Sequence, residues 1–144
     1  MNGISIIIPA YKSAQFIRGC LKSIQSKYPY EVIVGVDGCK ETLEVARDCV
    51  DGIITVIEFN DNRGPYCVKN DLVKLASFSK ILFFDADDIM GPGLVDHVFN
   101  ELKEYDFVKL NFSNFSENIE PGNEIKPLGE GIFAINKYVF KALN

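Results

Sequence analysis

The fold is decided by the stretch Ile81-Leu82-Phe83-Phe84-Asp85-Ala86-Asp87-Asp88, in which a run of apolar residues leads directly into three carboxylates. Four consecutive apolar residues predict a strand that is buried on both faces, as in a parallel sheet. The acids follow the carboxyl end of this strand, where open α/β sheets bind their ligands. Like charges this close repel one another, which favours either a divalent cation or a solvated acidic turn that caps the next helix.

The composition restricts the class of protein. With 144 residues, 47% of them hydrophobic and 24% charged, the chain fits one globular domain with a sizeable core. Its net charge of −5 argues against nucleic-acid binding and against general adhesion to anionic lipid, while a local basic patch stays open. The apolar run at residues 4–8 is too short for a signal peptide or a membrane span, so no span is expected.

The cysteines do not suggest a metal site. Cys20, Cys39, Cys49 and Cys67 form no CxxC pair, and the single histidine, His97, lies far from them in the chain. Structural zinc is therefore not expected. We expect a reduced, cytoplasmic compartment in which the cysteines serve mainly as small buried groups.

Strand and helix patterns alternate along the first two thirds of the chain. Strands are expected at residues 4–8, 31–36, 53–59 and 81–84, and helices at about 14–26, 40–50, 66–78 and 92–104. Ser13 is a candidate N-cap for the first helix, and Pro92 fits the first turn of the fourth. This alternation predicts a doubly wound parallel sheet with helices on both faces and the strand order 3-2-1-4.

The last third departs from this alternation. A strand at 107–112, a hairpin or irregular loop at 113–128, a short strand at 131–135 and a terminal helix at 136–144 are expected. In the predicted topology, Asp37 and Asp85 end the two strands that flank the first strand. One ligand at the carboxyl edge of the sheet could therefore contact both residues.

Four segments in register resemble family-two glycosyltransferases of the GT-A fold. The segments read Ile-Ser-Ile-Ile-Ile-Pro-Ala-Tyr (4–11), Val-Gly-Val-Asp-Gly-Cys (34–39), Asn-Arg-Gly with Lys-Asn (62–64 and 69–70), and the DXD-like Asp-Ala-Asp-Asp (85–88). Residues 129–140 resemble a later segment of the family. The resemblance covers nearly the whole chain and implies a Rossmann-like, three-layer α/β/α fold. A DXD motif alone is common, so the order and spacing of all four segments carry the resemblance.

The resemblance implies where a nucleotide would bind. Pro9, Ala10 and Tyr11 would line the base, and the Tyr11 ring would stack on it. Asp37 aligns with the second acid of the family's Asp-Asp pair and would accept a hydrogen bond from a ring N–H of uracil or guanine. Val36 replaces the first acid of that pair.

The same resemblance assigns the diphosphate and the metal. Lys69 would lie near the diphosphate, with Arg63 as the alternative. Asp85 and Ala86 would lie against the nucleotide, and Asp85 and Asp87 would bind Mg²⁺ or Mn²⁺, hard cations that prefer oxygen ligands. Asp88 is expected to cap the following helix or to support the metal ligands from outside.

The implied reaction transfers a sugar from a UDP- or GDP-sugar to an acceptor hydroxyl with inversion. The metal would act as a Lewis acid on the leaving diphosphate, and a carboxylate base would help the hydroxyl lose its proton. Of the late acids Glu117, Glu120 and Glu130, the last, which lies between two glycines, is the best candidate base. The acceptor, whether saccharide, lipid-linked or protein, stays open.

The chain is shorter than the family's usual catalytic domain. We therefore expect a single domain at 1–144, in which residues 1–90 form the nucleotide-binding half and 91–144 an incomplete acceptor-side half. A natural short form, a truncated gene and a fragment all fit this length. Self-association into a homo-oligomer could cover an incomplete end of the sheet, and the protein could act at the membrane surface without spanning it.

Other classes of protein fit less well. A haloacid-dehalogenase phosphohydrolase carries its Asp-x-Asp on the first strand, and a sugar nucleotidyltransferase has a glycine-rich first loop. A response-regulator receiver needs paired acids after the first strand. The main alternative is a truncated or degenerate module that binds a nucleotide sugar without turnover.

Overall fold

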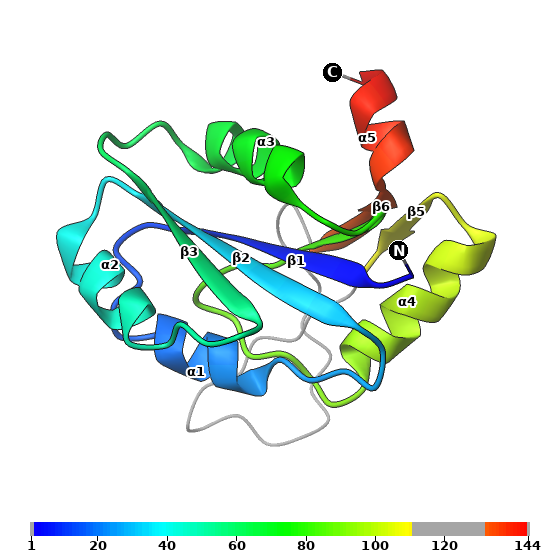
Figure 1. The fold of residues 1–144 in the computed structure, drawn as a ribbon, viewed down its shortest axis with the longest axis horizontal. Coiled ribbons are helices and arrows are strands. Elements are labelled where there is room, and N and C mark those ends of the chain that lie inside the picture. Colours follow the sequence, from blue (N-terminus) through cyan, green and yellow to red (C-terminus); the bar gives the residue numbers. More distant parts are fainter. Residues whose placement is uncertain (1, 111–131, 144) are drawn as a thin grey trace, which may run out of the picture.

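The computed structural model describes residues 2–110 and 132–143, which form a six-stranded sheet with helices on both faces (Figure 1). The strands are β1 (Ile4–Ala10), β2 (Tyr30–Asp37), β3 (Ile54–Phe59), β4 (Lys80–Phe83), β5 (Phe107–Lys109) and β6 (Phe133–Asn136). The helices are α1 (Ile17–Ser23), α2 (Lys40–Arg47), α3 (Pro65–Leu75), α4 (Leu94–Glu104) and α5 (Lys137–Leu143).

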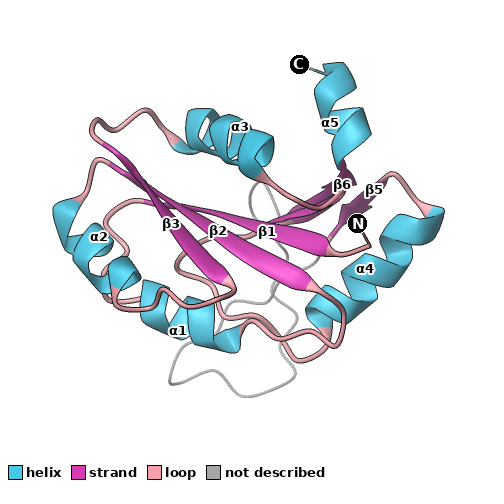
Figure 2. Ribbon diagram, viewed as in Figure 1, coloured by secondary structure: helices cyan, strands magenta, loops and turns pink. Residues whose placement is uncertain are grey.

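The strand order β3-β2-β1-β4-β6-β5 confirms the predicted order of the first four strands. These four strands are parallel, whereas β6 pairs antiparallel with both β4 and β5. The α/β class is therefore confirmed, with the antiparallel strand β6 added next to β4 and β5 beyond it at the edge. Figure 2 shows α1, α2 and α4 on one face of the sheet and α3 and α5 on the other, so the fold has three layers.

The alternation of side chains along β1 explains why both faces need a cover. Ile6 and Ile8 pack into the cluster under α1, α2 and α4, whereas Ile7 packs into the cluster under α3. All three side chains are fully buried. Because successive strand residues point to opposite faces, this continuous apolar run fits only a sheet that is covered on both sides.

Two predicted helix starts are wrong. The Ser13 side chain donates to the Tyr11 carbonyl, and only its backbone carbonyl accepts from Phe16 and Ile17 as α1 begins. At α4 the N-cap is Gly93, with a left-handed φ of 75°, so Pro92 precedes the helix instead of forming its first turn. In both places the chain makes a turn first, which moves the helix start by two or more residues.

The end of the chain agrees in part with the prediction. Residues 107–109 and 133–136 form strands, and 137–143 form a helix. The hairpin or irregular loop predicted at 113–128 lies outside the described residues. Within the described parts of the chain, no helix is both long enough and apolar enough to cross a bilayer.

Candidate functional site at the carboxyl edge of the sheet

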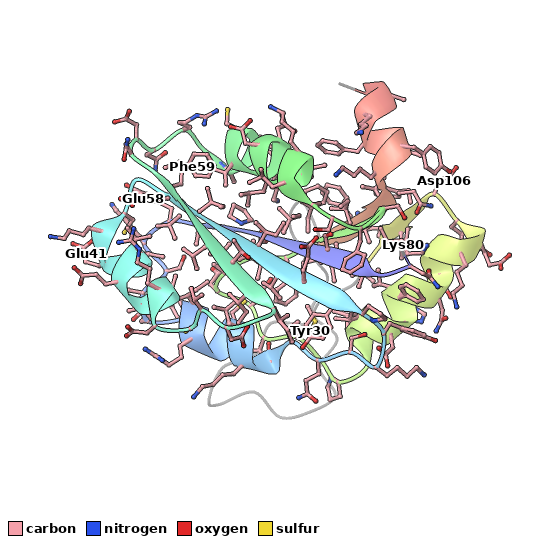
Figure 3. All side chains as sticks on the ribbon, in the orientation of Figure 1. Tyr30, Glu41, Glu58, Phe59, Lys80 and Asp106 are labelled. Atoms are coloured by element: carbon pink, nitrogen blue, oxygen red, sulfur yellow. The ribbon has the colours of Figure 1, made fainter. Side chains whose placement is uncertain are left out.

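The carboxyl ends of neighbouring strands bring the predicted site residues together. Strand β1 ends at Ala10, β2 at Asp37 and β4 at Phe83, and β1 lies between the other two. Figure 3 labels Glu58 and Phe59 at the end of β3, on the same edge. Loops from strands far apart in the sequence therefore meet at one edge, as in other open α/β sheets.

A hollow of about 350 Å³ lies at this edge. The described residues that line it are Pro9, Ala10, Tyr11, Asp37, Asn62, Gly64 and Pro65. The Tyr11 side chain is 44% exposed, so part of its ring is accessible, and the Lys12 Nζ lies 5.2 Å from the ring centroid. The predicted base-site residues thus share one hollow with the loop that follows β3.

Asp37 is only 3% exposed, and its two carboxylate oxygens already have partners. Oδ1 accepts from the backbone N–H of Arg63 at 2.9 Å, and Oδ2 accepts from that of Gly64 at 2.8 Å. The carboxylate thus ties the 60–64 loop to the end of β2. The role of Asp37 in binding the base stays a prediction. In the structure, the carboxylate instead makes two charge-assisted hydrogen bonds to backbone N–H groups.

The contact between the loops after β2 and β3 requires glycine. Gly38 has a φ of +68°, and a Cβ at this position would lie 2.6 Å from the backbone nitrogen of Asn62. A side chain here would therefore need both a strained backbone and a displaced loop. Gly38 therefore marks the place where the two loops touch.

The predicted diphosphate ligand lies beside the acidic motif. The Lys69 Nζ is 3.9 Å from Oδ1 of Asp85, and the side chains are 18% and 49% exposed. Arg63, the alternative, turns away and pairs with Asp71 at 2.9 Å. Of the two cations expected near a diphosphate, the structure brings only Lys69 to Asp85.

The acidic motif places its carboxylates close enough to influence one another. Burial raises the pKa of Asp85, as does the charge of Asp87, while Lys69 opposes the rise. Burial also raises the pKa of Asp88, followed by the charges of Asp85 and Asp87. The predicted helix cap at Asp88 is wrong, because Gly93 occupies the N-cap of α4 and the Asp88 N–H donates to the Asp85 carbonyl.

The residues present fit a metal that completes its ligands from a bound phosphate. Among residues 2–110 and 132–143, no group of three or more His, Cys, Asp or Glu side chains is arranged to hold a metal ion. Asp85 and Asp87 offer carboxylate oxygens, which hard dications prefer, and their mutual repulsion would be relieved by such an ion. Two carboxylates with remaining positions for phosphate oxygens and water are typical of Mg²⁺ sites.

Cys20 and Thr42, which the sequence did not single out, support the loops around the site. Cys20 is fully buried, and its Sγ lies 3.5 Å from the Asp85 carbonyl oxygen. Burial is the main reason that the pKa of the Cys20 thiol is raised to about 12, and the negative charges of Asp88, Asp87 and Asp85 contribute to the rise. The Thr42 hydroxyl accepts from the Ser13 N–H at 2.9 Å and donates to the Cys39 Sγ. The contact of Cys20 with Asp85 and that of Ser13 with Thr42 join residues far apart in the chain, so no local signal could have indicated them. Glu130, the candidate base, lies outside the described residues.

Fold and site together define an α/β domain of the GT-A type, with a polar site at the carboxyl edge of its parallel strands. The profile of Glycosyl transferase family 2 matches residues 5–139, so the chain belongs to this family. A poly(ribitol-phosphate) beta-glucosyltransferase of Bacillus spizizenii is 30% identical over 121 residues, which are 78% of this chain and 18% of the relative. The uncharacterized glycosyltransferase YwdF of Bacillus subtilis is 33% identical over 91% of this chain and 49% of its own length.

Solved structures confirm the fold. S. aureus TarS 1-349 in complex with UDP-GlcNAc superposes with a TM-score of 0.79 and 20% identity, covering 97% of this chain and 47% of the TarS 1-349 chain. The mannosyltransferase PcManGT of Pyrobaculum calidifontis, in complex with GDP-Man and Mn²⁺, gives a TM-score of 0.73 and 18% identity, covering 97% and 46%. The chain therefore spans less than half of each of these proteins.

Proposed function

We propose that the chain binds a nucleoside-diphosphate sugar at the carboxyl edge of its sheet and acts in inverting, metal-dependent transfer of the sugar to an acceptor hydroxyl. One observation carries this proposal: the hollow lined by Pro9, Tyr11 and Asp37 opens at the edge where Lys69 meets Asp85. A base site and a cation beside carboxylates are the two features that a nucleotide diphosphate requires. Family membership supports the same assignment.

The base would occupy the hollow and stack on the exposed part of the Tyr11 ring, with Pro9 and Ala10 forming the wall beside it. Asp37 would act mainly by holding the backbone at Arg63 in the position that closes the hollow. Backbone groups of this loop would then share the task of reading the base. Complexes of the structural relatives with UDP-GlcNAc and GDP-Man support UDP- and GDP-sugars as the donors to test.

The diphosphate would lie between Lys69 and the acidic motif, against Asp85 and Ala86. Asp85 and Asp87 would hold Mg²⁺ or Mn²⁺, and the Mn²⁺ in the complex of PcManGT supports this choice. When bound, such an ion supplies Lewis-acid stabilisation of the charge on the leaving diphosphate. Lys69 adds a positive charge from the protein, which is effective because its side chain is largely buried.

For the acceptor side, the proposal names a part of the chain, a candidate base and classes of acceptor. Residues 1–90 would form the donor half of a single domain and residues 91–144 part of the acceptor side, with Glu130 as the candidate base. A saccharide, a lipid-linked sugar and a protein are the acceptor classes to test. The alternative function is donor binding without turnover, and it differs from the first in one measurable product, the released nucleoside diphosphate.

The test combines ligand stabilisation with product release. UDP-GlcNAc, UDP-glucose and GDP-mannose are each added with Mn²⁺, with Mg²⁺ or with a chelator. Tm is measured, together with the nucleoside diphosphate released by slow hydrolysis, in which water accepts the sugar. One donor is expected to raise Tm, and only when the metal is present. A ligand at about 100 times its Kd stabilises the folded state by about 2.7 kcal/mol, which is measurable as a rise in Tm. Stabilisation without release would support the binding module, and no response to any donor would contradict both functions.

The metal ligands are tested with matched variants. Asp87→Asn is expected to abolish the metal-dependent rise in Tm, because it removes a carboxylate from the proposed ligand set. Asp48→Asn, in an exposed pair with Arg18 on the α1–α2 face, changes the charge equally and is expected to retain the rise. An unchanged response in Asp87→Asn would exclude its role as a ligand.

A further inference from the structure

A second hollow of about 350 Å³ is lined by residues of α3 and α5. These two helices lie on the face of the sheet opposite to α1, α2 and α4 (Figure 1). We call this hollow the basic groove. The described residues that line it are Asn70, Val73, Lys74, Lys137, Phe140 and Lys141. The Lys137 N–H donates to the Ser79 carbonyl just before β4, so the α5 end of the groove lies at the amino edge of the sheet, away from the proposed donor site.

The positive charges of the groove are only partly balanced. The Lys74 Nζ pairs with Asp71 at 2.8 Å, but the same carboxylate also pairs with Arg63 at 2.9 Å. One carboxylate thus serves two cations. None of the described residues that line the groove is acidic. In a chain with a net charge of −5, this is a local excess of positive charge.

A hydrogen bond to the backbone fixes the positively charged Lys137 side chain at the groove. Its Nζ donates to the Ala76 carbonyl at 2.6 Å, which anchors the first turn of α5 to the end of α3. Burial lowers the pKa of Lys137, and the nearby charge of Lys141 lowers it further, against a weaker opposing effect of Glu31. A bound anion would relieve this repulsion without any change of the fold.

The groove also offers apolar surface. Phe140 lines the groove and is only partly buried, and its ring centroid lies 5.8 Å from that of Phe83. Val73, which is 2% exposed, belongs to the cluster under α3 beneath this lining. Lysines beside a partly exposed phenylalanine suit a ligand that is anionic at one end and apolar at the other.

We propose that the basic groove binds the phosphate headgroup of an anionic lipid and so holds the protein at a membrane surface. The phosphate would lie against Lys74 and Lys141, and the first apolar atoms of the lipid against Phe140. The small area and the negative net charge exclude the long basic surface that a nucleic acid would need. The proposal does not depend on the donor site, because none of the residues that carry it lines that site.

The test is co-sedimentation of the 144-residue chain with vesicles of phosphatidylcholine, with and without a minority of phosphatidic acid. The chain is expected to bind only the anionic vesicles, and more weakly as salt is added. Lys141→Glu is expected to weaken this binding at least about fivefold, since one lysine near an anionic surface contributes about that factor. Lys22→Glu, an exposed lysine on α1, makes the same change on the other face and is expected to bind like the wild type.

Three outcomes would overturn the proposal. The first is no binding of the wild-type chain to phosphatidic acid vesicles. The second is equal binding by Lys141→Glu and Lys22→Glu, once equal Tm values show that both variants are folded. The third is a response of the α3 and α5 amide signals to inorganic phosphate, in the absence of vesicle binding. That last result would assign the groove to a free phosphate ligand instead of a lipid.

Discussion

The position of Asp37 in the fold could be predicted from the sequence, but its hydrogen-bond partners could not. Its position at the end of the second strand was predicted, and the structure puts it in the hollow at the carboxyl edge. Its two hydrogen-bond donors, however, come 26 and 27 residues later, from the loop after β3. A carboxylate that is buried with two backbone partners is primarily a means of positioning that loop.

Asp37→Ala is expected to lower the free energy of unfolding by about 2–4 kcal/mol, because the two backbone N–H groups lose a charged acceptor. It is also expected to weaken donor binding, since the 60–64 loop lines the hollow. Urea denaturation measures the first effect, and hydrogen exchange at the Arg63 and Gly64 amides reports on the loop. The control is Asp48→Ala, which removes an exposed carboxylate and is expected to change stability by less than about 1 kcal/mol. Equal stability of the two variants would contradict the positioning role.

At the scale of single elements, tertiary contacts determine where the helices begin and how they are held. Two of the wrong predictions, those for Ser13 and Pro92, assumed that a residue favoured at a helix start begins its helix at once. In α4 the first-turn acid Asp96 instead accepts from the Ser26 hydroxyl at 2.7 Å and from the Lys27 N–H at 3.0 Å. The helix is thereby tied to the segment that follows α1.

The hydrogen bonds that Asp96 accepts make part of the stability of the fold dependent on pH. The hydrogen bond from Ser26, followed by the Lys27 N–H and charge, lowers the pKa of Asp96 below its value in the unfolded chain. A lowered pKa contributes stability that is fully present above the unfolded value of about 3.9 and is lost as the pH falls through the folded value. The difference in unfolding free energy between the wild type and Asp96→Asn is therefore expected to be constant above about pH 5 and to shrink in acid.

Chemical denaturation at a series of pH values provides this measurement. Ser26→Ala removes the partner with the largest effect on Asp96 and is expected to reduce the acid sensitivity in the same direction. A difference between the wild type and Asp96→Asn that grows as the pH falls would show that the sign is wrong.

At the scale of the whole molecule, the sheet is built outward from β1. This strand pairs with β2 on one side and β4 on the other, and its inward-facing side chains are buried on both faces. Among the described strands, β3 and β5 lie at the edges, where backbone groups have a partner strand on one side only. Residues from both halves of the chain complete the cluster under α3, since Phe133 and Phe140 join Ile7 and Leu72.

Native-state hydrogen exchange is expected to follow this order. The amides of Ile6, Ile7 and Ile8 are expected to exchange only through global unfolding, whereas those of β3 and β5 exchange through smaller openings. The measurement compares exchange free energies along the strands with the denaturant-derived free energy of unfolding. Protection of the β3 amides equal to that of β1 would contradict this order.

Much of the architecture follows from the sequence alone. Burial patterns with periods of two and 3.6 residues are local, and crossover connections between parallel strands are right-handed, so strands 3-2-1-4 and their helices could be predicted. The antiparallel β6 beside β4 could not, because the period of a strand is the same in either direction. The motifs that indicated the family are local as well, because each occupies one strand end or the loop and helix that follow a strand.

The tertiary structure alone decided the partners of the charged groups. Lys69 rather than Arg63 lies beside Asp85, Asp37 holds a loop, and Lys137 with Lys141 faces α3 across a groove that no motif marks. These contacts join side chains that are distant in sequence, and their geometry depends on how helices pack on the sheet. The sequence by itself determined which strand ends carry the polar groups, since the position of a residue in its strand is a local property. Which of those groups meet is a property of the packed molecule.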